Sequence, residues 1–183
     1  NLQGLDKPIL DSLGIDKNKP EKQQRNQTGS PILEEGDILL NTTLAETSDW
    51  QQVDLPVVST LRHFCIETLS SYTEDNQACI SQLNLFDDKA QPIDKTKWEV
   101  VYVSSEQADK NLGIAENLFD GDISSFWHTD PATEPGQPHR IIVDIKEIYK
   151  ISALRFKVRK GAFLSGKVKE INVYGRPQFF LFH

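Results

Sequence analysis

Alternation of apolar and polar residues is the dominant pattern from Gly36 onward. In the run RHFCIETL (62–69), Phe64 and Ile66 fall on one side and Cys65 on the other. A period of two is typical of β-strands, in which successive side chains point to opposite faces. Similar short runs recur with turn residues between most of them, and they cover residues 37–44, 51–58, 62–69, 78–86, 98–104, 140–145, 151–159, 167–174 and 179–182.

These runs predict an all-β protein. About nine short strands and no long helical period are typical of a β-sandwich. One short helix is predicted at residues 115–119, where apolar residues are three to four positions apart.

The first 35 residues differ from the rest of the chain. The segment DKNKPEKQQRNQTGSP (16–31) has no apolar residue, which is typical of a solvated linker. We therefore predict a tail at residues 1–35 and a folded domain at residues 36–183. The chain contains no Met, even at position 1, and we interpret it as a piece of a longer protein.

Charge and cysteine content exclude several classes of protein. The net charge of −7 and the absence of a Lys/Arg cluster argue against a nucleic-acid partner, because phosphate binding needs concentrated positive charge. No apolar run approaches the roughly 20 residues needed to cross a bilayer. Two cysteines are too few for a disulfide scaffold, so we expect Cys65 and Cys79 to be buried free thiols.

The stretch with the most chemical information is NLFDGDISSFWHT (117–129), followed by PHRIIVDI (138–145). It combines an acidic turn, two serines, a tryptophan and a histidine just before a predicted strand. Such a set at a loop end favours ligand binding. The chain has no GxSxG, HExxH, GxGxxG or P-loop string, so we expect no catalysis by it.

The strings AENLFDGDISSFWHT, PHRIIVDI, ISALRFKVRKG and GKVKEINVYG, in this order, resemble the discoidin or coagulation-factor type C family, which is galactose-binding-like. They are most similar to its carbohydrate-binding modules on bacterial glycoside hydrolases. The resemblance covers residues 98–175 and implies a jelly-roll β-sandwich of about eight or nine antiparallel strands.

Residues 62–87 resemble the strand pair that normally closes such a domain at its C-terminal end, but here they come first. Either the domain is circularly permuted, with residues 37–93 supplying the closing strands, or these residues end a preceding module. The first explanation is physically reasonable because the termini of a sandwich often lie close together.

The resemblance implies a structural calcium ion at the acidic turn. Oxygen atoms of Asp120, Asp122 and Ser125 would hold it, because Ca²⁺ prefers six to eight hard oxygen ligands. The family usually adds a Glu from the closing strand, and Gln82 stands at that position. Sodium is an alternative ion, and the two carboxylates could instead only cap turns through hydrogen bonds.

The resemblance also implies a sugar site. His128 and Arg159 stand where the relatives have hydrogen-bond donors to a sugar, and Phe163 is the nearest candidate for stacking, with Tyr72 behind it. His128 could instead only hydrogen-bond a neighbouring loop. We expect Trp127 to be a core residue.

The predicted function is that of a non-catalytic carbohydrate-binding module, which targets a secreted or surface-located glycan-active enzyme to its substrate; a periplasmic location would also fit. Its partners would be a polysaccharide or oligosaccharide and the catalytic domain of that parent enzyme, and we expect a monomer. The alternative is a protein or phospholipid adhesion module of the discoidin type. A membrane partner is disfavoured by the acidic net charge. A spacer with a degenerate site is a third interpretation.

Overall fold

The computed structural model describes residues 20–21, 25, 27–133, 136–159 and 165–183. Most of the predicted tail and Phe163 lie outside the described residues. The elements, in chain order, are β1 (Pro31–Ile32), η1 (Glu35–Asp37), β2 (Ile38–Thr43), β3 (Gln51–Thr68), β4 (Cys79–Ile80), β5 (Gln82–Asp87), β6 (Glu99–Val103), η2 (Asp109–Asn111), η3 (Ala115–Phe119), β7 (Trp127–His128), β8 (His139–Lys157), β9 (Glu170–Arg176) and β10 (Leu181–Phe182). Within the described residues the helices are all of the short 3₁₀ type, and the strand pairs within the sheets are antiparallel, so the all-β prediction is confirmed.

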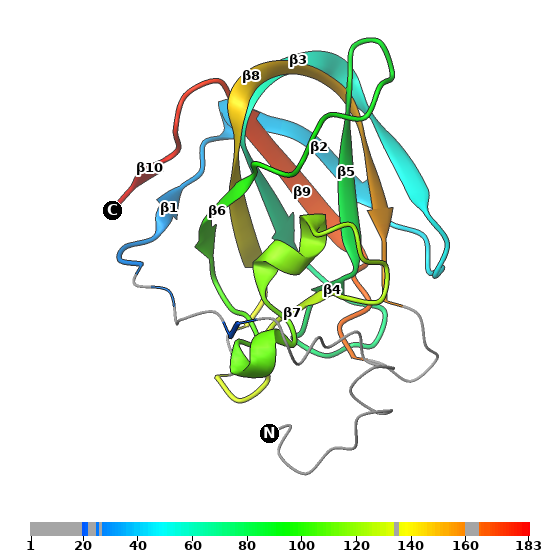
Figure 1. The fold of residues 1–183 in the computed structure, drawn as a ribbon, viewed down its shortest axis with the longest axis vertical. Coiled ribbons are helices and arrows are strands. Elements are labelled where there is room, and N and C mark those ends of the chain that lie inside the picture. Colours follow the sequence, from blue (N-terminus) through cyan, green and yellow to red (C-terminus); the bar gives the residue numbers. More distant parts are fainter. Residues whose placement is uncertain (1–19, 22–24, 26, 134–135, 160–164) are drawn as a thin grey trace.

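One bent sheet supplies both layers of the sandwich (Figure 1). Its strand order is β2-β9-β3-β8-β5, and β6 also pairs with β8. The first part of β8 pairs with β6 and its last part pairs with β5, so the two ends of this strand belong to opposite layers. The main core lies between these layers.

The two longest strands each join two runs that the sequence predicts as separate strands. Residues 51–58 and 62–68 lie in β3, and residues 140–145 and 151–157 lie in β8, so each predicted pair falls almost entirely within one strand. The register of β3 against β8 shifts between Asp54 and Ser59, a stretch that contains Pro56. Proline cannot donate to a strand ladder, and such an irregularity lets a strand bend without ending. The break in the apolar pattern therefore marks a bend.

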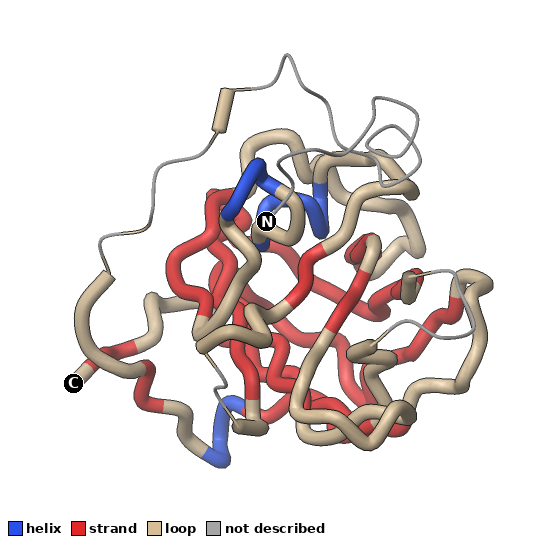
Figure 2. Tube along the Cα trace, turned by 90° about the horizontal axis from the view of Figure 1, so that it is seen from below, coloured by secondary structure: helices blue, strands red, loops and turns tan. Residues whose placement is uncertain are grey.

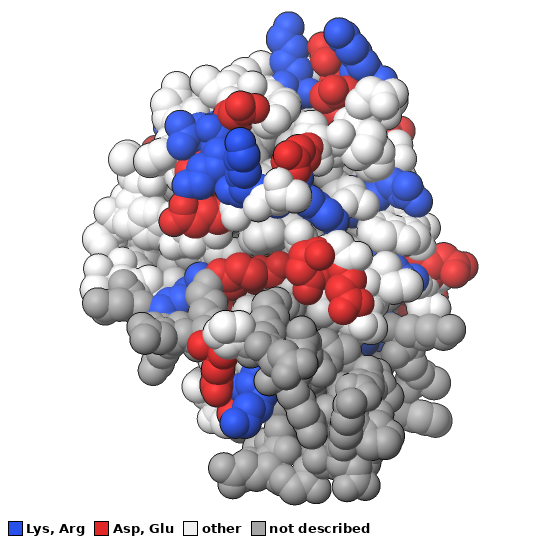
Figure 3. Space-filling view, viewed as in Figure 1, with Lys and Arg blue, Asp and Glu red and all other residues white. Residues whose placement is uncertain are grey.

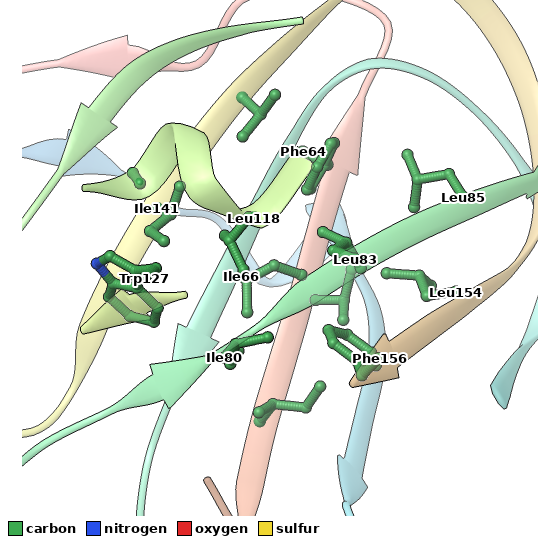
Figure 4. Packing of buried hydrophobic residues seen from close by; sticks show 14 of the residues in the cluster. Phe64, Ile66, Ile80, Leu83, Leu85, Leu118, Trp127, Ile141, Leu154 and Phe156 are labelled. Atoms are coloured by element: carbon green, nitrogen blue, oxygen red, sulfur yellow. The ribbon is translucent and has the colours of Figure 1, made fainter. Parts of the chain in front are cut away.

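The main core is built from side chains of both layers and of two short elements in the connecting loops, η3 and β7 (Figure 4). Leu118 of η3 and Trp127 of β7 lie among side chains from β3, β5 and β8. Trp127 is fully buried, and its indole N–H donates to the carbonyl oxygen of Ser105 at 2.9 Å. A hydrogen-bonded indole adds apolar contact without leaving a polar atom unsatisfied. The prediction that Trp127 is a core residue is confirmed.

A second, smaller cluster lies on the outer side of the sheet. It contains Cys65, Ile142, Tyr174 and Phe180, and it is packed by partly buried residues that include Leu33, next to β1, and Phe182 of β10. β1 and β10 pair with each other beside it. The C-terminal residues therefore cover an apolar surface that the sheet leaves outside the main core.

Both cysteines are free and buried. Burial raises the pKa of each thiol, for Cys79 to about 12, because the charged thiolate would lose its hydration. The prediction of buried free thiols is confirmed.

Contacts with the sandwich begin within the segment predicted as a linker. Arg25 forms an ion pair with Glu106 at 2.6 Å. The side-chain amide of Gln27 donates to the carbonyl oxygen of Val103 at 2.5 Å and accepts from its N–H at 3.3 Å. The described part of this segment therefore contacts the end of β6 and the residues that follow it.

Candidate functional site

Three segments that are far apart in the sequence meet at one end of the sandwich, the end nearest the viewer in Figure 2. The loop after β3 meets the segment before β9 through a bridge between Ser71 and Val168. The backbone N–H of Cys79 donates to the carbonyl oxygen of Gly166 at 2.8 Å, and that of Thr129 donates to Ala78 at 3.0 Å. These hydrogen bonds hold the loop end together.

His128 lies on β7 in the middle of this loop end and is almost fully buried. Its Nδ1 is 2.5 Å from the carbonyl oxygen of Thr129, and its Nε2 is 2.9 Å from the hydroxyl oxygen of Ser165. A carbonyl oxygen can only accept, so the proton is on Nδ1, and Nε2 of the neutral ring accepts from the serine. Burial lowers the pKa of His128 and favours this neutral ring. His128 thus hydrogen-bonds a neighbouring loop through Ser165.

Arg159 lies beside His128, with Phe126 as the link between them. The Arg159 guanidinium carbon is 4.0 Å from the centre of the Phe126 ring. The ring centres of Phe126 and His128 are 6.4 Å apart in an edge-on arrangement. Phe126 was missed in the sequence, although it is two positions before His128, a spacing that puts both side chains on one face of a strand.

Asp75 is a second residue that sequence reasoning missed. Its carboxylate accepts hydrogen bonds from the hydroxyl of Ser71 at 2.9 Å and from the backbone N–H groups of Gln77 and Gly166, each at 3.2 Å. Burial raises the pKa of Asp75, but the hydrogen bonds from the two hydroxyls, of Ser71 and Thr73, and from the backbone outweigh it, so the pKa is lowered overall. The ionised Asp75 ties the loop after β3 to the segment at Gly166.

Tyr72 belongs to the same end but its hydroxyl is already engaged. It donates to the carbonyl oxygen of Leu44 at 2.7 Å, and the Lys169 ammonium lies 5.4 Å from its ring centre. The structure therefore brings His128 and Arg159 together and leaves Tyr72 with a packing contact to a lysine. The roles predicted for these residues in ligand binding stay predictions.

The four residues predicted to bind a metal also meet. The Gln82 side-chain N–H₂ group is 2.8 Å from Asp120 Oδ1 and 2.9 Å from the carbonyl oxygen of Asp122. The hydroxyl of Ser125 donates to Asp120 Oδ2 at 2.6 Å. The carboxylate of Asp122 turns away, since its Oδ1 accepts from the N–H and the hydroxyl of Ser124 at 2.9 and 2.6 Å.

This donor set fits a divalent cation poorly. Among the residues that the structure describes, only the carboxylate of Asp120 faces the position where the oxygens converge, and the Gln82 amide presents N–H donors to it. In the described part of the chain, no group of three or more His, Cys, Asp and Glu residues could hold a metal ion. Calcium at this turn stays a prediction, and the hydrogen-bond donors that fill the turn argue against it.

The fold is an antiparallel β-sandwich of the galactose-binding-like class, with its polar loop residues gathered at one end. Residues 100–178 match the model of the F5/8 type C domain, so the resemblance to the discoidin family is confirmed for this part of the chain. A sialidase of Micromonospora viridifaciens is 33% identical over 84 residues, which are 45% of this chain and 13% of the sialidase. The match thus spans only a small part of that relative. As for membrane spans, no helix in the described ranges is long and apolar enough to form one.

Proposed function

We propose that this chain is a non-catalytic carbohydrate-binding module whose ligand contacts the loop end at Arg159 and the neighbouring His128. The observation that carries the proposal is the position of Arg159. Its guanidinium carbon lies over the Phe126 ring, 4.0 Å from the ring centre, and no carboxylate forms an ion pair with it among the described residues. Its N–H groups are therefore not neutralised by an acidic side chain.

Such an arrangement suits a sugar. A pyranose offers hydroxyl oxygens to a forked donor and C–H groups to an apolar surface, and a cation held on an aromatic ring provides the donor in a fixed position. The hydrogen bonds of His128 and Asp75 would keep the surrounding loops in place. A single small polar site of this kind gives weak binding, with a Kd of about 1 mM.

The biological role follows from tethering. A module fixed to a catalytic domain raises the local concentration of substrate, so a weak site is sufficient. The F5/8 type C match and the sialidase relative support a parent enzyme that acts on glycans outside the cytoplasm. The parent's substrate and the ligand of this module need not be the same sugar.

Adhesion to phospholipid is the competing function, and the charge distribution disfavours it. The chain has a net charge of −7. On the face shown in Figure 3, acidic side chains form a row at the level of η3, while basic side chains stand in separate groups. A negative surface repels anionic headgroups, so liposome binding is the decisive comparison.

The test is calorimetric titration with a panel of sialylated, galactosylated and plant-type oligosaccharides, using Arg159→Ala and the matched control Arg155→Ala. Arg155 lies on β8, four residues before Arg159, and its guanidinium carbon is 5.1 Å from the centre of the Trp50 ring. Both variants therefore lose the same charge beside an aromatic ring. We expect Arg159→Ala to weaken binding about tenfold or more and Arg155→Ala to leave it nearly unchanged.

A wild-type chain that binds liposomes and no glycan would contradict the proposal. Equal losses in the two variants would contradict the assignment of the site to Arg159. Thermal unfolding of each variant, measured alongside, separates lost binding from lost folding.

A further inference from the structure

The acidic turn is filled by a hydrogen-bond network centred on Gln82, which is almost fully buried. The Gln82 side-chain nitrogen has three oxygen neighbours, the carbonyl of Asn117 at 2.7 Å, Asp120 Oδ1 at 2.8 Å and the carbonyl of Asp122 at 2.9 Å. The hydroxyl of Ser125 is within 3.3 Å of oxygens from the same three residues. The amide nitrogen therefore occupies the point on which the oxygens of this turn converge.

The orientation of that amide is fixed from its other side. Gln82 Oε1 accepts from the backbone N–H of Gly121 at 3.2 Å and lies 3.4 Å from the ammonium group of Lys95. If the amide were flipped, its N–H₂ group would face the Gly121 N–H and the Lys95 ammonium, and its oxygen would face three other oxygens. Both contacts are repulsive, so these neighbours select the orientation with N–H₂ pointing inward.

Lys95 adds a charge that the turn would otherwise need from a bound ion. Its ammonium group donates to Asn84 Oδ1 at 2.6 Å and to the carbonyl oxygen of Leu83 at 3.3 Å, which hold it in place. Burial lowers the pKa of Lys95, and the negative charge of Asp120 opposes this shift. The positive charge of Lys95 thus acts on Asp120, whose carboxylate faces the cluster.

We propose that Gln82 and Lys95 replace a structural cation at the acidic turn, so that this chain orders its ligand loops without a divalent metal ion. The amide N–H₂ group takes the place of the ion among the oxygens, and Lys95 supplies the compensating charge. A cation would require Gln82 to present its oxygen inward, against the ammonium group behind it. Lys95 therefore both replaces the ion and excludes it.

Thermal unfolding in millimolar CaCl₂ and in excess EDTA tests the proposal. The melting temperature of the wild-type chain should be the same in both. The double variant Gln82→Glu/Lys95→Gln restores a carboxylate and removes the competing charge, so it should gain calcium binding. At about 100 times the Kd, calcium should raise its melting temperature by roughly 5–10 °C. Lys97→Gln, at an exposed position two residues from Lys95, is the control and should behave as the wild type.

A double-mutant cycle tests the internal network itself. Lys95→Gln and Asp120→Asn should each lower the melting temperature, and the two together should lower it by less than the sum, because each single variant removes the same interaction. Additive effects would overturn the proposal. So would a calcium-dependent rise in the wild type, or a double variant Gln82→Glu/Lys95→Gln that folds and ignores calcium. None of these readouts depends on glycan binding, so the proposed function stands or falls separately.

Discussion

At the residue scale, Gly166 controls how two segments of the loop end approach each other. It has a φ of +77°, and an added Cβ would lie 3.0 Å from the backbone of Ala78 and Cys79. Its N–H donates to Thr73 and Asp75, and its carbonyl oxygen accepts from Cys79. The next residue before it, Ser165, holds the ring of His128. The position thus needs a residue without a side chain.

We expect Gly166→Ala to lower the free energy of unfolding by about 1–3 kcal/mol, since it combines a strained φ with a close backbone contact. The control is Gly36→Ala, where an added Cβ meets nothing within 4 Å, and which should change the value by no more than about 0.5 kcal/mol. Urea unfolding followed by tryptophan fluorescence measures both. Equal effects of the two substitutions would show that the close backbone approach at Gly166 does not contribute to the free energy of unfolding.

The buried histidines make stability depend on pH. His63 is stacked on Phe179 with ring centres 4.1 Å apart, and its Nε2 is 3.8 Å from Asp144 Oδ2. Burial lowers the pKa of His63, although the Asp144 carboxylate opposes the shift. Burial also lowers the pKa of His128 and of His139. All three rings are thus neutral in the folded chain over a pH range in which the histidines of an unfolded chain bind protons.

The unfolding free energy should therefore fall as the pH is lowered from 7 to 5. Below the ordinary histidine pKa of about 6.5, the unfolded chain takes up protons that the folded chain does not, which favours unfolding. His63→Gln should flatten the slope by at most about 1.4 kcal/mol per pH unit, the limit for one proton. Urea titrations at pH 5, 6 and 7 measure the slope, and a flat profile for the wild type would contradict the expectation.

The carboxylates act in a different pH window. Hydrogen bonds and the Arg62 guanidinium lower the pKa of Asp144 against the effect of burial, and hydrogen bonds lower that of Asp75. A lowered carboxyl pKa stabilises the folded chain above about pH 4, and this stabilisation is lost as the pH falls through the folded-state value. The two windows can therefore be separated in the same titration.

At the element scale, local pattern predicted where strands occur, because a period of two is a property of neighbouring residues. It could not predict that residues 51–58 and 62–69 form one strand, since this depends on pairing with β8 across the bend. For the same reason the pattern does not show the contacts of Arg25 and Gln27, whose partners lie more than 75 residues away. Tertiary pairing decided these features.

In the candidate site, too, some features could be predicted from local sequence and others depend on tertiary contacts. The resemblance predicted that Gln82 belongs with the acidic turn and His128 with Arg159, and the structure places the members of each pair near one another. Their roles in binding stay predictions. It missed Asp75, Phe126 and Lys95, whose contacts are with residues from other segments of the chain and depend on the tertiary fold. The direction in which the Gln82 amide points is set by such neighbours, so it could not be predicted from the motif.

The C-terminal element should contribute to stability through Phe180. This side chain is 3% exposed and packs with Cys65, Ile142 and Tyr174 in the outer cluster. Phe180→Ala should lower the free energy of unfolding by about 3–5 kcal/mol through lost burial and a residual cavity. The neighbouring Leu181 is 59% exposed, so Leu181→Ala should cost no more than about 0.5 kcal/mol. Chemical denaturation would distinguish them, and a near-zero cost for Phe180→Ala would mean that the outer cluster does not support the fold.

At the scale of the whole molecule, the family match and the physical sheet do not coincide. The matched residues 100–178 contain β7, β8, β9 and most of β6. β9 does not neighbour β8 in the sheet, because β3 lies between them and pairs with both. Residues before the match therefore supply a central strand. This topology supports the proposal that the domain is circularly permuted, with residues 37–93 supplying its closing strands. It disfavours the alternative that these residues end a preceding module.

A dissection of the chain tests this proposal. Residues 94–183 alone should not fold, because without β2 and β3 the strand β9 has lost both neighbours, and the buried side chains of Phe64 and Ile66 are missing from the core. Open strand edges and an open core cost far more than the marginal stability of a domain this small. We expect a poorly dispersed amide spectrum for this fragment and a dispersed spectrum with one cooperative thermal transition for residues 27–183. Adding residues 27–93 in trans should restore dispersion, since the strands would then pair as in the intact chain. A cooperative transition for residues 94–183 alone would instead mean that the preceding strands belong to a separate module.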